Sequence, residues 1–232
     1  MATPDVFTWP RAEDGPVGEW RSDSRCRAAF TSGSSRSPIA KSWPAQWCLE
    51  ANSLAIQVYG GYGYTKEFDV EQYYRDNRLN AIHEGPTAIH GLDLLGYKVV
   101  MQDGAGLALL IERINETIDK ALQSGHPAAY ACDLRRAVQR LADVTETLWR
   151  AGDVATTLAN STIYLEATGH IVIAWMWLEQ LIAASDHQGD FYDGKRAAAQ
   201  YFYAYELPKV DPQFDLLARL DRTGVEAQAS WF

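Results

Sequence analysis

The sequence predicts an all-α fold, and three observations support that class. No stretch of any length alternates apolar and polar residues with the period of two that a half-buried strand would show. From residue 38 onward, apolar residues recur instead at spacings of three and four, which is typical of amphipathic helices. Glycines, prolines and short polar turns separate these periodic segments.

The composition is that of a globular protein with an acidic surface. The 232 residues are enough to bury a substantial core, and 47% hydrophobic with 22% charged residues is ordinary for a soluble domain. A net charge of −9 disfavours binding to nucleic acid or to an anionic membrane. Cys26, Cys48 and Cys132 are widely spaced, which indicates a reducing compartment and no disulfide framework. We therefore expect a cytoplasmic protein.

The chain divides by composition into three parts. Residues 1–37 are rich in serine, arginine and glycine, show no period, and lack the apolar run of a secretory signal. We expect a loosely ordered leader there, followed by a first helical domain over 38–103 and a second over 104–232.

Three helices are expected in the first domain. The segment 38–59 has mixed helical spacing and ends at Gly60 and Gly61, which supply the positive φ that helix C-termini favour. A loop precedes a short helix through "VEQYYRDNRL", where Glu71 and Arg75 stand four residues apart and can pair. The third helix begins close to Pro86. Cys48 is expected to be a packed core thiol.

After residue 103 we expect four helices with short connections, as in an antiparallel bundle, and a short last helix. The first carries an apolar stripe from Leu107 to Leu122 and ends at Gly125 and Pro127. The second has apolar residues spaced from Leu134 to Leu148, and the third is a long apolar helix from Asp153 to Ala184. Because Glu179 lies in its most apolar part, "IVIAWMWLEQLIAA", we expect a buried bundle helix and not a membrane span. "FYDGKRAAAQYFYAYEL" is expected to be helical up to Pro208, and "FDLLARLDR" to form a short last helix.

The stretch "IHEGPTAIHG" carries the main chemical candidate, Glu84. A zinc peptidase needs HExxH, but Thr87 occupies the position of the second histidine, so no metal site is expected. "GGYGYT" has Lys66 where a dinucleotide-binding loop has its third glycine. His126, His170 and His187 are scattered and carry no signal. Taken alone, Glu84 is either a catalytic carboxylate or an acid that favours a helix N-terminus.

Residues 57–96 closely resemble the C-terminal helical domain of flavin-dependent acyl-CoA dehydrogenases. That family shows a Q-x-x-GG-x-GY element, then a helix with E-x-x-x-RD-x-R, then an EG-T turn. The matching residues are Gln57, Gly60, Gly61, Gly63 and Tyr64; Val70, Glu71, Arg75, Asp76 and Arg78; and Glu84 with Gly85. Residues 104–232 are similar in length and helical pattern to the extra C-terminal domain of one branch of the family. The resemblance thus implies an all-α fold in which the C-terminal part of the acyl-CoA dehydrogenase helical bundle is followed by an antiparallel bundle.

The resemblance also implies a reaction. Family members oxidise an acyl-CoA thioester to the 2-enoyl-CoA: a glutamate removes the α-proton and the β-hydride passes to FAD. Glu84 falls on the position of that catalytic base. Gln57, Gly60 and Gly61 would line the FAD site, often that of a neighbouring subunit, together with Gly85 and Thr87. Arg75 and Asp76 would form a structural ion pair. The implied partners are an acyl-CoA, an electron-transfer acceptor and further copies of the chain.

This chain departs from the family pattern in two ways. Pro86 follows Glu84-Gly85 where the family usually has threonine, so the nearest hydroxyl is one position later, on Thr87. The N-terminal helical domain and the central β-domain of the family have no counterpart in the sequence. We therefore expect a truncated or frameshifted form of a longer gene, with weak FAD binding and little turnover; sequencing the 5′ end of the transcript tests this. The alternative is a non-catalytic helical module for oligomerisation.

Overall fold

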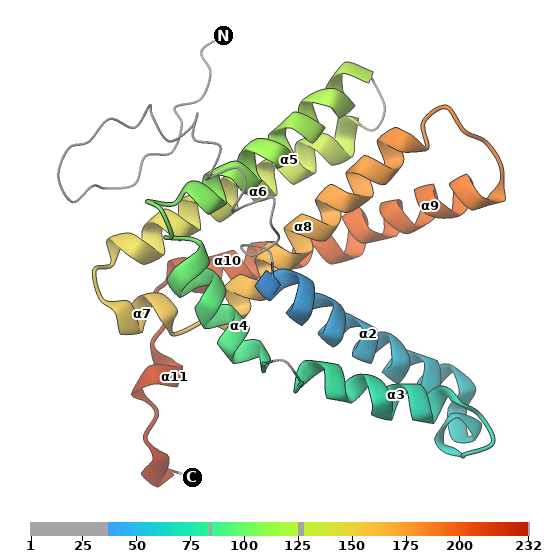
Figure 1. Ribbon diagram of the computed structural model, residues 1–232, viewed down its shortest axis with the longest axis horizontal. Coiled ribbons are helices and arrows are strands. Elements are labelled where there is room, and N and C mark those ends of the chain that lie inside the picture. The colour runs from blue at the N-terminus through green and yellow to red at the C-terminus, as the bar shows by residue number, and fades with distance from the viewer. Residues whose placement is uncertain (1–36, 84, 125–127, 232) are drawn as a thin grey trace.

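The structure of the chain is a computed structural model that describes residues 37–83, 85–124 and 128–231 (Figure 1). Within these ranges every regular element is a helix, so the predicted all-α class is confirmed. The expected leader over residues 1–37 lies outside the described residues, apart from Ser37.

The first helices form a hairpin that projects from the rest of the molecule (Figure 1). Helix α2 (Ser37–Tyr59) ends in the 3₁₀ segment η2 (Gly60–Tyr64), and α3 (Val70–Arg78) returns beside α2 before the 3₁₀ turn η3 (Leu79–Ala81). The predicted end of α2 is confirmed, because Gly60 has a φ of +61°, a left-handed conformation that glycine adopts without strain.

Helix α4 connects this hairpin to the bundle. It spans Thr87–Asp93 and continues as the π-helical segment η4 (Leu94–Lys98). The predicted start near Pro86 is confirmed, with Pro86 itself at the N-cap in an extended conformation. Leu94, Leu95 and Val99 are buried against the helices that follow.

The remaining helices form a bundle of two antiparallel pairs with a shorter helix across them (Figure 1). One pair is α5 and α6, which both contact α8; the second pair is α8 and α9; and α10 packs on α6 and α8. The bounds are α5 (Ala105–Ser124), α6 (Ala128–Arg150), α8 (Ser161–Ala183), α9 (Asp190–Tyr201) with its continuations η5 (Phe202–Glu206) and η6 (Leu207–Lys209), α10 (Val210–Ala218), α11 (Thr223–Glu226) and η7 (Ala229–Trp231).

The prediction of one helix from Asp153 to Ala184 is wrong. The structure has a short helix α7 (Val154–Leu158), a turn, and then α8. Asp153 caps α7 by accepting hydrogen bonds from the backbone N–H groups of Ala155 (3.3 Å) and Thr156 (3.1 Å). The Asn160 side chain donates to the carbonyl oxygen of Asp221 (2.8 Å), which holds the turn before Ser161.

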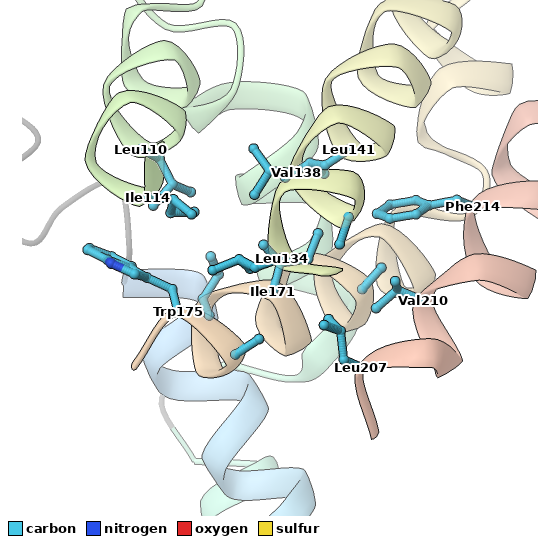
Figure 2. Packing of buried hydrophobic residues seen from close by; sticks show 14 of the residues in the cluster. Leu110, Ile114, Leu134, Val138, Leu141, Ile171, Trp175, Leu207, Val210 and Phe214 are labelled. Carbon is cyan, nitrogen blue, oxygen red and sulfur yellow. The ribbon is translucent and has the colours of Figure 1, made fainter. Parts of the chain in front are cut away.

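One hydrophobic core runs through the bundle (Figure 2). It contains the buried stripe of α5, the spaced leucines of α6 and the centre of α8, so α8 is the buried bundle helix that the sequence predicts. Among the described residues, no helix is long and apolar enough to cross a membrane. Ile39 of α2 and the buried Leu94 and Leu95 of η4 belong to the same cluster, so the hairpin and the bundle share this core.

Two glycines allow α2 and α4 to lie close to α8. A Cβ atom on Gly91 of α4 would lie 2.7 Å from the carbonyl oxygen of Ser161, at the start of α8. A Cβ atom on Gly169 of α8 would overlap the indole ring of Trp43 on α2. Both positions therefore require glycine for these helices to pack as they do.

Candidate active site

The glycine element of the sequence lies at the tip of the hairpin, where its backbone is open to approach. Gly60 and Gly61 are exposed, and a Cβ atom at either position would meet no described atom within 4 Å. Gln57, one turn earlier on α2, is also exposed. Gly63 is different: its Cβ would lie 2.6 Å from the carbonyl oxygen of Ile56, so this glycine lets η2 fold back onto α2.

The charged side chains Glu71, Arg75 and Asp76 interact with other side chains of α3. The predicted pair of Glu71 and Arg75 is confirmed, with 3.1 Å between a guanidinium nitrogen and a carboxylate oxygen. The expected ion pair of Arg75 with Asp76 is wrong, because Asp76 instead accepts from Gln72 (3.5 Å). Adjacent residues of a helix point in different directions, so each side chain meets a neighbour four positions away.

A row of amide side chains joins α3 to α2. Asn80 donates from Nδ2 to Oδ1 of Asn77 (2.8 Å), and Asn77 donates to Oδ1 of Asn52 on α2 (3.3 Å). The row leads from α2 to the turn that contains His83, whose backbone N–H donates to the carbonyl oxygen of Leu79 (2.7 Å). The sequence reasoning missed these asparagines, although polar residues on the facing sides of two neighbouring helices are a usable signal.

Glu84, the predicted base, lies outside the described residues, but the residues after it are well defined. Gly85 has a φ of +116°, and a Cβ there would lie 3.3 Å from Cε1 of the His90 ring, so both conformation and space favour glycine. Thr87 begins α4, and its hydroxyl oxygen accepts a hydrogen bond from Nε2 of Gln46 on α2 (3.2 Å). Gln46, which the sequence reasoning also missed, thus ties the start of α4 to α2.

A pocket of about 350 Å³ lies between α2 and α3 and reaches His83, the residue before Glu84. Helix α2 contributes Lys41, Pro44, Ala45 and Cys48 to its lining, and the facing side contributes Asn77, Asn80 and His83. The prediction that Cys48 is a packed core thiol is wrong, since Cys48 is exposed. Cys48 lies on the side of α2 that lines this pocket, whereas buried Ile39 lies on the side that joins the core.

The structure separates the predicted cofactor residues into two groups. Thr87 contacts Gln46, whereas Gln57, Gly60 and Gly61 lie about three to four turns further along α2. At 1.5 Å per residue, Gly60 is roughly 20 Å along the helix axis from Gln46. Within one chain, therefore, the glycine element and the turn after Glu84 form two sites at opposite ends of the hairpin. Among the described residues, no three His, Cys, Asp or Glu side chains are placed to hold a metal ion.

Comparison with known proteins assigns both halves of the chain to related domains. Residues 110–228 match the family model for the acetyl-CoA dehydrogenase C-terminal-like domain, and residues 20–95 match that for the acyl-CoA dehydrogenase C-terminal domain. The second match begins at Trp20, inside the segment that composition sets apart as a leader.

Several known proteins are similar to this chain, some over most of its length and others over a short part. A 3-methylmercaptopropionyl-CoA dehydrogenase of Ruegeria pomeroyi is 33% identical over 205 residues, which is 82% of this chain and 33% of that protein. A broad-specificity linear acyl-CoA dehydrogenase of Mycobacterium tuberculosis is 26% identical over 211 residues, or 84% of this chain and 34% of that protein. A subunit of the caffeyl-CoA reductase-Etf complex of Acetobacterium woodii is 40% identical over 58 residues, which is 25% of this chain and 15% of that protein. The chain spans about a third of the length of the first two relatives.

Proposed function

Because this chain belongs to the acyl-CoA dehydrogenase family, we propose that it contributes a carboxylate base and part of an FAD site to the α,β-dehydrogenation of an acyl-CoA thioester. The observation that carries this proposal is the family match over 20–95, which includes all three sequence elements of the hairpin and its turn. Two of the relatives that cover most of the chain are named as dehydrogenases of CoA thioesters.

In this proposal Glu84 removes the α-proton of the thioester. A carboxylate suits that step when its pKa is raised toward the working pH by a water-poor site. The conformation of Gly85 and the Gln46–Thr87 hydrogen bond fix the backbone that follows Glu84. Bound FAD would supply the acceptor for the β-hydride. Turnover by the chain alone is expected to be low, since it contributes the base and only part of the cofactor site.

The residues at the tip of the hairpin fit one part of FAD. Exposed Gly60 and Gly61, with open space over both, allow a pyrophosphate to approach the backbone closely. Thr87 accepts from Gln46 and keeps its own O–H to donate. Since these two groups lie at opposite ends of the hairpin, we propose that the glycine element serves the FAD of a neighbouring subunit.

Flavin retention tests this proposal. The purified chain is mixed with excess FAD and gel-filtered, and the bound flavin is read from its visible absorbance. We expect Gly61→Val to lose retained flavin, because its side chain enters the open space over η2, where a Cβ atom meets no described atom within 4 Å. Gly194→Val is the matched control, since a Cβ on this exposed glycine of α9 also meets no described atom within 4 Å. Equal flavin retention by the two variants would argue against the glycine site.

The role of Glu84 is tested separately, with an acyl-CoA and an artificial electron acceptor. Glu84→Gln keeps the size of the side chain but removes the base, so we expect flavin retention to be unchanged and flavin reduction by the acyl-CoA to fall by about two orders of magnitude or more. Reduction at the unchanged rate would show that Glu84 is not the base.

By analogy with the Acetobacterium woodii subunit, whose name places it in an Etf complex, we propose an electron-transfer flavoprotein as the natural acceptor.

A non-catalytic oligomerisation module is the second candidate, and the surface of the hairpin favours it. Large apolar side chains are exposed along α2 to α4: Val58 is 84% exposed, Tyr64 86% and Ile89 55%. Exposed large apolar side chains mark a contact with another protein when they gather into a patch. A colourless chain that sediments as a stable oligomer after incubation with FAD would support this function over the first.

A further inference from the structure

His170 occupies the point where α2 meets the bundle. It lies near the middle of α8 and is fully buried, with 0% of its surface exposed. The indole rings of Trp43 and Trp47 on α2 stand nearly perpendicular to the imidazole, with ring centres 5.7 and 5.0 Å away. The ring of Phe202 on η5 lies at 6.1 Å. We refer to these four residues as the His170 junction.

The hydrogen-bonding groups around the imidazole do not match either neutral tautomer. Nδ1 lies 2.9 Å from the carbonyl oxygen of Glu166, to which it can only donate, and 3.3 Å from Nε1 of Trp43, from which it can only accept. Nε2 is buried and has no hydrogen-bond partner among the described residues. With the proton on Nδ1, both the Trp43 N–H and Nε2 lack a partner; with the proton on Nε2, that N–H lacks one. Either neutral tautomer therefore leaves at least one polar group without a partner, which weakens this contact between α2 and α8.

Three charged groups face the imidazole, and none of them accepts a direct hydrogen bond from Nε2. On α8 itself, the Glu166 carboxylate accepts from Gln213 of α10 (2.9 Å). On η5, the nearest Glu206 oxygen is 3.9 Å from Nε2, which is too long for a hydrogen bond. Glu206 is already paired with Lys209 of η6 (2.6 Å), whose ammonium group also lies over the Trp47 ring. The groups of α2 in the junction are the two uncharged indoles.

Burial is the dominant influence on the charge state. Burial lowers the pKa of His170 below 6.5, and the positive charge of Lys209 lowers it further. The hydrogen bond to the Glu166 carbonyl oxygen and the negative charges of Glu166 and Glu206 act in the opposite direction and raise the pKa. The unfolded chain therefore binds a proton at a higher pH than the folded chain does. Stability from this site is fully present above about pH 6.5 and is lost as the pH falls from there through the lower pKa of the folded state.

We propose that the His170 junction is an acid-sensitive contact: the neutral imidazole holds α2 against α8, and protonation in the mildly acidic range releases α2 while the bundle stays folded. The release is local because Trp43 and Trp47 reach His170 from α2, which adds only Ile39 to the buried core cluster. Helices α5 and α10 each pack on α6, and all three pack on α8. The proposal does not depend on flavin binding or on Glu84.

Hydrogen exchange of the full-length chain tests the proposal. Exchange rates are measured by mass spectrometry at about pH 7.5 and about pH 5.5, and each rate is corrected for the intrinsic exchange rate at that pH. Peptides covering Ile39–Trp47 are expected to lose protection by up to about tenfold per pH unit below 6.5, since the opening takes up one proton. Peptides covering Leu134–Leu148 of α6 are expected to keep theirs. His170→Gln should abolish the acid effect on α2, and His187→Gln, at an exposed position, should retain it.

A measurement on the unaltered chain covers the case in which the His170→Gln variant fails to fold. The imidazole of His170 is followed by NMR as the pH is lowered, and we expect its titration midpoint to lie below 6.5. A midpoint at or above 6.5 would overturn the proposal. Equal protection of α2 at the two pH values would also overturn it, as would a loss of protection shared by α2 and α6.

Discussion

The packing of α4 on α8 leads to a quantitative prediction for the substitution Gly91→Ala. The added Cβ would lie 2.7, 2.8 and 2.9 Å from three backbone atoms of Ser161 and Thr162, where ordinary contacts are about 3.5–4.0 Å. These atoms belong to the start of α8 and cannot move as a side-chain tip does. The two helices must therefore separate by several tenths of an ångström or more.

The expected cost follows from two opposing effects. Overpacking of a close contact costs about 1–3 kcal/mol. The higher helix propensity of alanine offsets up to about 1 kcal/mol of that. Gly91→Ala should therefore lower the free energy of unfolding by about 1–2 kcal/mol, or the melting temperature by roughly 2–8 °C. Chemical denaturation of both proteins at neutral pH measures the difference.

Gly194→Ala provides the control, because a Cβ there meets no described atom within 4 Å and the residue lies inside α9. It makes the same chemical change in a helix without the close contact, and should raise stability by up to about 1 kcal/mol. If Gly91→Ala stabilised the protein as much as Gly194→Ala does, the close approach of α4 to α8 would be refuted.

Two further substitutions test local features of the bundle. Hydrogen bonds from Thr156 and Arg222 lower the pKa of Asp153 from 3.8 to about 2, so the stability that this carboxylate contributes is present above pH 3.8 and is lost as the pH falls toward 2. The Asp153→Asn variant should therefore unfold more readily at neutral pH and lose less stability between pH 3.8 and 2. If acid titrations showed equal losses for the two proteins, the cap would be contradicted. Tyr164→Phe removes the buried hydroxyl that lies 2.8 Å from the Thr145 hydroxyl. It should lower the free energy of unfolding, measured in urea, by about 1 kcal/mol. An unchanged free energy of unfolding would mean that this hydrogen bond makes no net contribution to stability.

The helical parts of the fold were predictable where local sequence decides the structure. The apolar stripe of α5 is buried as its period predicts, and Gly60 ends α2 through its own backbone conformation. The break between α7 and α8 was not predictable from apolar content, because it depends on a cap at Asp153 and on the contact of Asn160 with Asp221, 61 residues away. Such a distant partner leaves no trace in the periodicity of the segment.

The candidate site divides in the same way. Gln57, Gly60, Gly61, Gly85 and Thr87 were found from short motifs, but motif order does not show that the glycine element and Thr87 lie at opposite ends of one hairpin. The hydrogen bond from Gln46 to Thr87 was also not predictable, because it depends on how α2 packs against the start of α4. His170 gave no signal by spacing to other histidines, although an imidazole inside the apolar run "GHIVIAWMW" was itself a sign of burial.

The contact of Trp43 with His170 joins residues 127 positions apart, and this has a consequence for the order of folding. On the ribosome, α2 emerges long before α8 is made, so the two tryptophans of α2 stay exposed while more than half of the chain is synthesised. Contacts of such high sequence separation form late and slow the completion of the fold. The hairpin should therefore be the part of the nascent chain that is most exposed to chaperones, and docking of α2 should be the last step in its maturation.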